Sequence, residues 1–101
     1  MKEIRVVELA ERDIDRIWTF ILHRSQSFAI ADGVVNSLYD AFLLFTSTPE
    51  AGRRRDDFSS GLRAFPAGKY IIYYRESQEH IDVLRVIHGK RNQKKAYRDI
   101  D

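Results

Sequence analysis

Arginine recurs on or beside strand-like segments throughout the second half of this chain. A run of three arginines is followed by single arginines and a basic strand end, and together these are Arg53, Arg54, Arg55, Arg63, Arg75, Arg85, His88, Lys90 and Arg91. Guanidinium groups bind phosphate and carboxylate groups through paired hydrogen bonds, and histidine can transfer protons near neutral pH. The pattern predicts a surface for an anionic or acidic partner, either in an RNA-cutting enzyme or in a module that docks on a protein.

The enzyme alternative needs a base, an acid and cationic groups around a phosphate. Arg63 and Arg85 could hold that phosphate and His88 could move the protons, while the basic loop and tail grip the RNA backbone. Against this alternative, the adjacent loop carries Asp56 and Asp57, which place negative charge beside the supposed phosphate site.

The same residues also have a structural interpretation. Arg63 and Arg85 could each tie the loop to the sheet through a salt bridge, for which the candidate carboxylates are Asp56, Asp57 and Asp82. His88 is interpreted as a strand-end residue, followed by a turn in which Gly89 adopts a positive φ.

Composition sets the broad class of the protein. The chain has 101 residues and 44% hydrophobic residues, which predicts one folded domain. It has no cysteine, and His23 and His80 lack partners at ligand spacing, so we expect no metal or other cofactor. No apolar run approaches the roughly 20 residues of a membrane span, and we expect a cytoplasmic protein.

Charge is divided between the two halves of the chain. Residues 1–51 carry 5 Lys/Arg against 8 Asp/Glu, a net charge of −3, and residues 52–101 carry 12 against 7, a net charge of +5. This asymmetry predicts a directed electrostatic surface.

The elements that must position these residues follow from apolar spacing. A strand at 4–7 precedes two helical segments, with apolar stripes at Leu9, Ala10, Ile14, Ile17, Trp18 and Ile21 and at Ile30, Val34, Leu38, Phe42 and Phe45. Ser27 is the expected cap of the second helix, and Pro49 follows its end. Strands are expected at 62–65, 69–75 and 80–87, the last covered on both faces.

This order predicts an α+β domain with a helical hairpin on one face of a mostly antiparallel sheet. We expect the helices to share their core with the strand residues Leu62, Ile71, Tyr73, Val83 and Leu84. Alternation also places Ile81, Val83, Arg85 and Ile87 on one face of the last strand. Off the helical stripes, the candidates to line a partner groove are Phe20, Leu22, Leu43 and Leu44.

Four short segments in this order resemble the ParE branch of the RelE/ParE superfamily of bacterial toxins, over Ile4 to Arg91. They are Pro49-Glu50-Ala51-Gly52-Arg53-Arg54-Arg55, Gly61-Leu62-Arg63, Tyr70-Ile71-Ile72-Tyr73-Tyr74-Arg75 and Arg85-Val86-Ile87-His88-Gly89-Lys90-Arg91. The resemblance implies the toxin of a type II toxin–antitoxin module that inhibits growth and stabilises plasmids. It also implies neutralisation by a ParD-like antitoxin in a hetero-oligomeric complex, and DNA gyrase as the target.

The resemblance therefore implies one RelE/ParE-like toxin domain over 1–101: an N-terminal strand, an antiparallel two-helix hairpin on one sheet face and a three-stranded antiparallel meander. Whether the basic tail at 91–101 is ordered or flexible stays open. The nine basic residues named at the outset are expected to contact gyrase or the antitoxin, with none of them catalytic and nucleic acid met only through those partners.

Two alternatives stay open. RelE-like relatives cut messenger RNA on the ribosome, and such an mRNA interferase would here use Arg63, Arg85 and His88. A chain without toxicity, serving only as half of an autoregulating repressor complex, is the other alternative.

Overall fold

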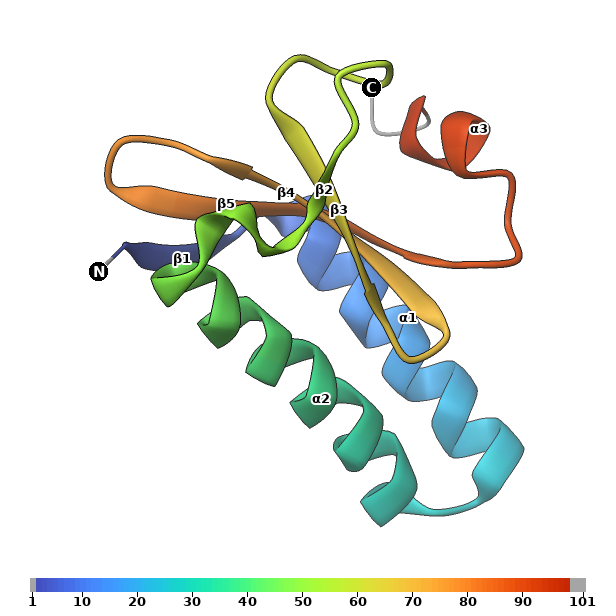
Figure 1. The fold of residues 1–101 in the computed structure, drawn as a ribbon. Coiled ribbons are helices and arrows are strands. Elements are labelled where there is room, and N and C mark those ends of the chain that lie inside the picture. The colour runs from blue at the N-terminus through green and yellow to red at the C-terminus, as the bar shows by residue number, and fades with distance from the viewer. Residues whose placement is uncertain (1, 99–101) are drawn as a thin grey trace.

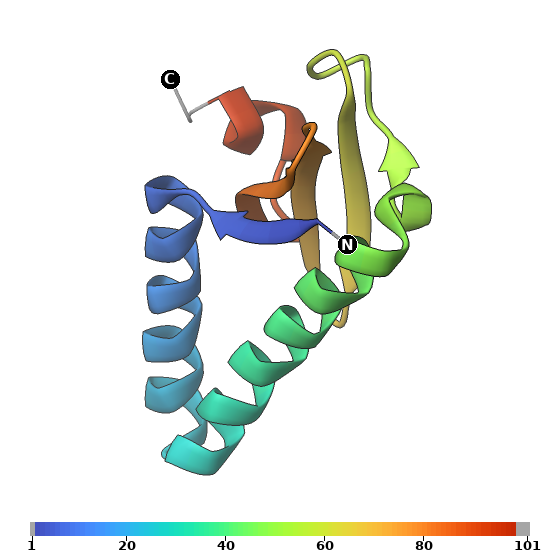
Figure 2. The ribbon, with the colours of Figure 1, turned by 90° about the vertical axis from the view of Figure 1, so that its left-hand side faces the viewer.

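The computed structural model describes residues 2–98 of the chain. The elements, in chain order, are β1 (Glu3–Val6), α1 (Glu8–Ser25), α2 (Phe28–Ser47), the 3-10 turn η1 (Pro49–Ala51), β2 (Arg53–Arg54), β3 (Leu62–Ala67), β4 (Tyr70–Glu76), β5 (His80–His88) and α3 (Gln93–Arg98). The antiparallel hairpin of α1 and α2 covers one face of the sheet, and α3 lies on the other side (Figures 1 and 2). The predicted α+β fold is confirmed.

The five strands form one sheet in the order β1-β5-β4-β3-β2. Neighbouring strands are antiparallel except β1, which pairs in parallel with β5 through Glu3–Val6. The meander of β3, β4 and β5 was predicted, whereas the two-residue edge strand β2 and the helix α3 were not. Six residues of the tail thus form α3, and residues 99–101 lie outside the described part of the chain.

The two long helices begin in different ways. Ser27 caps α2 as predicted, because its hydroxyl accepts the backbone N–H of Ile30 at 3.2 Å. α1 starts without a side-chain cap and ends at Gln26, whose φ of 57° turns the chain sharply into α2. By length and composition alone α2 could also cross a membrane, contrary to the sequence expectation. In this fold it packs on the sheet and buries Ala31, Leu38, Ala41, Phe42 and Phe45.

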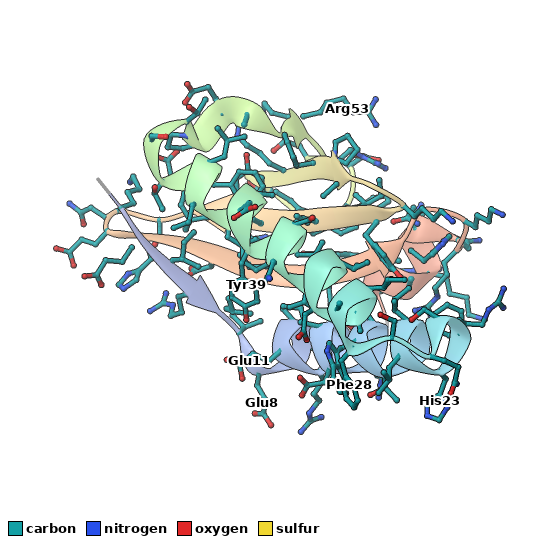
Figure 3. All side chains as sticks on the ribbon, turned by 90° about the horizontal axis from the view of Figure 1, so that it is seen from below. Glu8, Glu11, His23, Phe28, Tyr39 and Arg53 are labelled. Atoms are coloured by element: carbon teal, nitrogen blue, oxygen red, sulfur yellow. The ribbon has the colours of Figure 1, made fainter. Side chains whose placement is uncertain are left out.

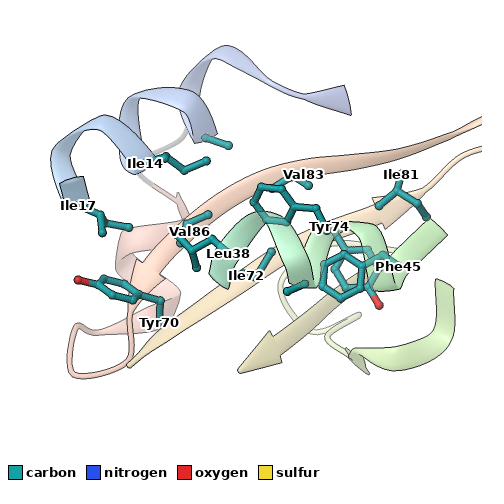
Figure 4. Packing of buried hydrophobic residues seen from close by; sticks show 13 residues of the cluster. Ile14, Ile17, Leu38, Phe45, Tyr70, Ile72, Tyr74, Ile81, Val83 and Val86 are labelled. Atoms are coloured by element: carbon teal, nitrogen blue, oxygen red, sulfur yellow. The ribbon is translucent and has the colours of Figure 1, made fainter. Parts of the chain in front are cut away.

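The main core lies between the hairpin and the sheet (Figure 4). Phe45 of α2 stacks on Tyr74 of β4 with ring centroids 3.9 Å apart, and Leu38, Ile72 and Val83 are buried around them. Each such side chain contributes roughly 1.5–3 kcal/mol of burial free energy. The hairpin is therefore fixed to this face by packing.

A second, smaller core lies on the opposite face of the sheet. It contains Leu62, Tyr73 and Ile87 with Ala64 and Ala96, and Ile71 and Leu84 pack against it. The prediction that Leu62, Ile71, Tyr73 and Leu84 share the helical core is therefore wrong, and only Val83 lies there. Strands buried on both faces carry apolar residues at odd and even positions, so the sequence does not reveal which set faces the helices.

A β-bulge also divides β5. Tyr73 pairs with Arg85 but Tyr74 pairs with Val83, so Leu84 is an extra residue. Ile81 and Val83 belong to the helical core, whereas Ile87 belongs to the second core. The expectation that Arg85 and Ile87 share a face with Ile81 and Val83 is wrong for this reason.

Candidate functional site

The three consecutive arginines are divided between the two faces of the sheet. Arg53 pairs with Ala64, which belongs to the second core, and Arg54 pairs with Arg63. Successive side chains of a strand point to opposite faces, so Arg53 lies on the face away from the hairpin and Arg54 on the other. In Figure 3, Arg53 lies on the far side of the molecule from Glu8 and Glu11 of α1, as the charge division between the chain halves predicts.

Arg53 and Arg55 border a depression of about 430 Å³ on the second face, which we name the basic hollow. Its lining comes from β2 and the loop after it, β3, β4, the turn after β5 and the start of α3, and consists of Arg53, Arg55, Ala64, Pro66, Ile71, Tyr73, Gly89 and Gln93. The Tyr73 hydroxyl donates to Oε1 of Gln93 at 2.7 Å and so links the floor to α3. The amide of Gln93 donates to the backbone oxygens of His88 and Arg91, which fixes this wall.

Two carboxylates of the loop between β2 and β3 form ion pairs with Arg54 and Arg55. Arg55 donates two hydrogen bonds to Asp57 at 2.9 and 3.0 Å, and its guanidinium lies 3.9 Å from the ring centroid of Phe58. Arg54 donates to Asp56 at 2.8 Å. Exposed pairs of this kind contribute little to stability, so their role here is to orient the arginines.

These contacts and burial shift the pKa values of two loop carboxylates and of Tyr73. The hydrogen bond from Arg54 and that from the backbone of Gly61 hold the pKa of Asp56 below its ordinary value, and Arg55 does the same for the pKa of Asp57. Burial raises the pKa of Tyr73, against a smaller opposing effect of the Arg55 charge. The Tyr73 hydroxyl is therefore protonated at neutral pH.

Arg63 and Arg85 do not make the predicted salt bridges. Arg63 donates to the backbone oxygen of Gly52 at 2.8 Å. Arg85 is buried and pairs with Asp13 of α1, with Nε–Oδ2 and Nη2–Oδ1 distances of 2.7 and 3.0 Å. Asp13 also accepts the N–H of Val86, and Arg85 donates to the backbone oxygen of Ala96 in α3. The partner of Arg85 was missed because Asp13 is 72 residues away in sequence.

Tyr74 ties the segment before β2 to the sheet. Its hydroxyl accepts the N–H of Gly52 at 2.7 Å and donates to the backbone oxygen of Pro49 at 2.8 Å. A Cβ atom at Gly52 would lie 2.8 Å from the Tyr74 ring, so glycine is required there for packing. The sequence offered no signal for this contact, which positions the start of the arginine run.

The side chain of His88, at the end of β5, lies on the helical face and not in the basic hollow. The Nδ1 atom of His88 accepts the backbone N–H of Lys90 at 3.1 Å, and its ring meets the edge of Tyr70, which belongs to the helical core. Gly89 does not have the positive φ expected for it. Its N–H donates to the backbone oxygen of Lys69, and a side chain at this position would crowd that oxygen. Lys90 and Arg91 are exposed in the turn that leads to α3.

The nuclease cluster predicted from sequence is therefore not assembled. Arg63 pairs with Tyr74, which pairs with Val83, and His88 lies five residues further along β5, roughly 16 Å away along the strand. Arg85 is enclosed by its bonds to Asp13 and Ala96. Arg75 lies elsewhere again, where it donates to the Ser59 hydroxyl at 2.6 Å and to the backbone oxygen of Ser60. Within residues 2–98, no group of three His, Cys, Asp or Glu side chains is arranged to hold a metal ion.

A second surface, which we name the apolar groove, lies between α2 and the β3–β4 turn. It encloses about 480 Å³ and is lined by Ile21, Ile30, Val34, Ser37, Leu38, Ala41, Phe65, Ala67, Gly68, Lys69 and Tyr70. None of the predicted groove residues Phe20, Leu22, Leu43 and Leu44 lines it, although Phe20 lines another depression, together with Ile17 and Val86. Both helices extend past the sheet (Figure 2), which leaves Ile30, predicted to be inward, 54% exposed.

Comparison with known proteins agrees with this fold. A family model described as "ParE toxin of type II toxin-antitoxin system, parDE" matches residues 4–93. Toxin ParE3 of Caulobacter vibrioides is 28% identical over 80 residues, which cover 79% of this chain and 79% of that toxin. Toxin ParE1 of the same organism is 26% identical over 92 residues, which cover 91% of this chain and 94% of that toxin.

Two solved structures share the fold. The chromosomal ParDE system from P. aeruginosa contains a chain that superposes with a TM-score of 0.74 at 17% identity, covering 87% of this chain and 96% of that one. The toxin–antitoxin complex RelBE2 from Mycobacterium tuberculosis gives a TM-score of 0.53 at 24% identity, covering 86% and 96%. The match to the family model spans nearly the whole described chain, and the protein belongs to the ParE toxins of type II toxin–antitoxin systems.

Proposed function

We propose that this ParE-family toxin inhibits DNA gyrase by binding to it in the cytoplasm, and that a ParD-like antitoxin neutralises it. The observation that carries the binding mechanism is the separation of Arg63, Arg85 and His88. A phosphoryl-transfer site needs its acid, base and cations within hydrogen-bond reach of one phosphate. The arginines here are instead spread over a surface, which suits recognition of a macromolecule.

The face of the sheet that carries the basic hollow is the surface that we assign to the target. Arg53 is exposed, and Arg55 is oriented by Asp57 and Phe58 beside it. Lys90 and Arg91 are exposed in the turn that begins at Gly89, a residue of the hollow. Of the nine basic residues predicted as contacts, Arg85 is buried in an ion pair and acts through the fold rather than by touching a partner.

The apolar groove is the surface that we assign to the antitoxin. An amphipathic helix can bury an apolar stripe in a groove of this kind, and Ile30, Val34 and Phe65 offer it apolar walls. The structural relatives named above include a ParDE system and the RelBE2 toxin–antitoxin complex, which supports an antitoxin as partner.

A supercoiling assay tests the target. The purified chain, added to gyrase and relaxed plasmid, should block supercoiling and accumulate cleaved DNA, and His88→Ala should retain most of this effect because His88 has no catalytic role. Cleavage of transcripts on translating ribosomes, lost in His88→Ala, would instead establish the mRNA interferase. Absence of any growth defect on expression would favour the repressor-subunit alternative.

A pair of variants on α2 tests the antitoxin surface. Ile30 lines the apolar groove and is 54% exposed, whereas Leu43 is 64% exposed and lies outside the groove. When co-expressed with the reading frame beside its gene, Ile30→Asp should escape neutralisation and Leu43→Asp should not. Equal neutralisation of both variants would exclude the groove as the docking site.

A further inference from the structure

The basic hollow combines features that contact with a protein target does not require. Its rim carries the guanidinium groups of Arg53 and Arg55, while Ala64, Pro66 and Ile71 provide apolar surface inside it. Charged rims around an apolar floor suit a ligand that is anionic at one end and flat and apolar at the other.

The rim offers one arginine, Arg53, as the group that would bind a phosphate. Arg53 and Arg55 are two residues apart and lie on the same face, with their Cα atoms about 7 Å apart, a spacing similar to that of successive phosphates in an extended strand. Among residues 2–98 Arg53 makes no ion pair, so its guanidinium is available to a ligand, whereas Nε and Nη2 of Arg55 are already bound to Asp57.

The floor distinguishes among anionic ligands. A duplex hides the flat faces of its bases in the stack, whereas a single strand exposes them for apolar contact. Polyglutamate would satisfy the arginines but has no apolar group for the surface of Ala64, Pro66 and Ile71.

We propose that the basic hollow binds single-stranded nucleic acid, with a phosphate at Arg53 and a base over Ala64, Pro66 and Ile71, and does not cleave it. The lining contains no histidine or carboxylate that could act as a base. The proposal goes beyond inhibition of gyrase, because it assigns this chain its own contact with nucleic acid, and its test needs no gyrase.

Fluorescence anisotropy with a labelled oligothymidine of about 12 nucleotides tests the proposal. The wild-type chain should bind, and Arg53→Glu should weaken binding about tenfold or more. The matched control is Arg12→Glu, the same charge change at an exposed residue of α1 that pairs with Glu8 at 2.7 Å. This control should weaken binding less than about twofold, through net charge alone.

Three further probes decide what is recognised. An abasic strand of the same length should bind more weakly than oligothymidine, duplex DNA and polyglutamate should compete poorly, and a ribo-oligonucleotide should be recovered intact. Equal loss of binding in Arg53→Glu and Arg12→Glu, or full competition by polyglutamate, would overturn the proposal. Cleavage of the ribo-oligonucleotide would overturn the part that denies catalysis.

Discussion

The two faces of the sheet use the same strands for different purposes. On one face two helices of 18 and 20 residues bury a core that includes Phe45, Ile72 and Tyr74. On the other face, within residues 2–98, a six-residue helix and the β2–β3 loop cover Leu62, Tyr73 and Ile87. The thin cover leaves room for the basic hollow, whereas the thick cover leaves only a groove at its margin.

The comparison shows how strand alternation sorts a run of identical residues. Arg53 and Arg55 contribute to the basic hollow, while Arg54 and Arg63 lie on the other side of the same strands. A charged run in a sequence is therefore not one patch once it enters a sheet. Variants that act on one face and spare the other measure how independent the two faces are.

The largest expected effect on stability is at the ion pair that joins α1, on one face of the sheet, to α3 on the other. Asp13 of α1 and Arg85 form a buried ion pair, and Arg85 also binds α3 through Ala96. Asp13→Ala would leave a buried guanidinium and the Val86 N–H without their partner, which should lower the free energy of unfolding by about 3–5 kcal/mol. Urea denaturation measures this loss.

The control for that variant is Asp15→Ala, which makes the same charge change at an exposed position of the same helix. It should cost less than about 0.5 kcal/mol. The double variant Asp13→Leu/Arg85→Met should recover much of the loss, because apolar residues need no buried counter-charge. A cost for Asp13→Ala no larger than for Asp15→Ala would mean that the two covers are not joined through this pair.

Two neighbouring tyrosines compare the faces directly. Tyr74→Phe removes the acceptor of a buried N–H and the donor to Pro49 on the helical face, and should cost about 1–3 kcal/mol. Tyr73→Phe removes one hydrogen bond to the side chain of Gln93, which water can replace, and should cost about 1 kcal/mol. Urea denaturation of both variants gives the ranking. The reverse order would show that α3 is held more firmly than the segment before β2.

Much of the fold was predictable from local sequence. The stripe of Leu38, Phe42 and Phe45 and the cap at Ser27 marked α2, and the β-rich segments marked the meander. The assignment of strand residues to faces failed, because both faces are covered and the bulge at Leu84 shifts the alternation. The cover on both faces and the bulge both depend on tertiary contacts, which the alternation of apolar residues in the sequence does not reveal.

The site was predictable only as a set of residue types. The sequence marked the arginines, but the choice between contact, ion pair and burial depended on partners distant in sequence, such as Asp13 for Arg85 and Gly52 for Arg63. The role of Tyr73 and Gln93 in the hollow was also missed, since α3 was not expected. Arg53 and Arg55 were predicted to act together, and they do line one hollow, because residues two apart on an extended chain lie close together on the same face.

The smallest expected effect on stability concerns the β2–β3 loop, which borders the basic hollow. Both carboxylate oxygens of Asp56 are used, one by Arg54 and one by the N–H of Gly61, and the pKa of Asp56 in the folded protein is therefore below its unfolded value of about 3.9. A lowered pKa stabilises the fold above the unfolded pKa, and this contribution is lost as pH falls through the folded pKa. The difference in unfolding free energy between wild type and Asp56→Asn should thus be largest near neutral pH and shrink below about pH 4. High salt should reduce the difference at neutral pH, because Asp56 and Arg54 are exposed, and a difference that is constant with pH would show that folding does not lower the pKa of Asp56.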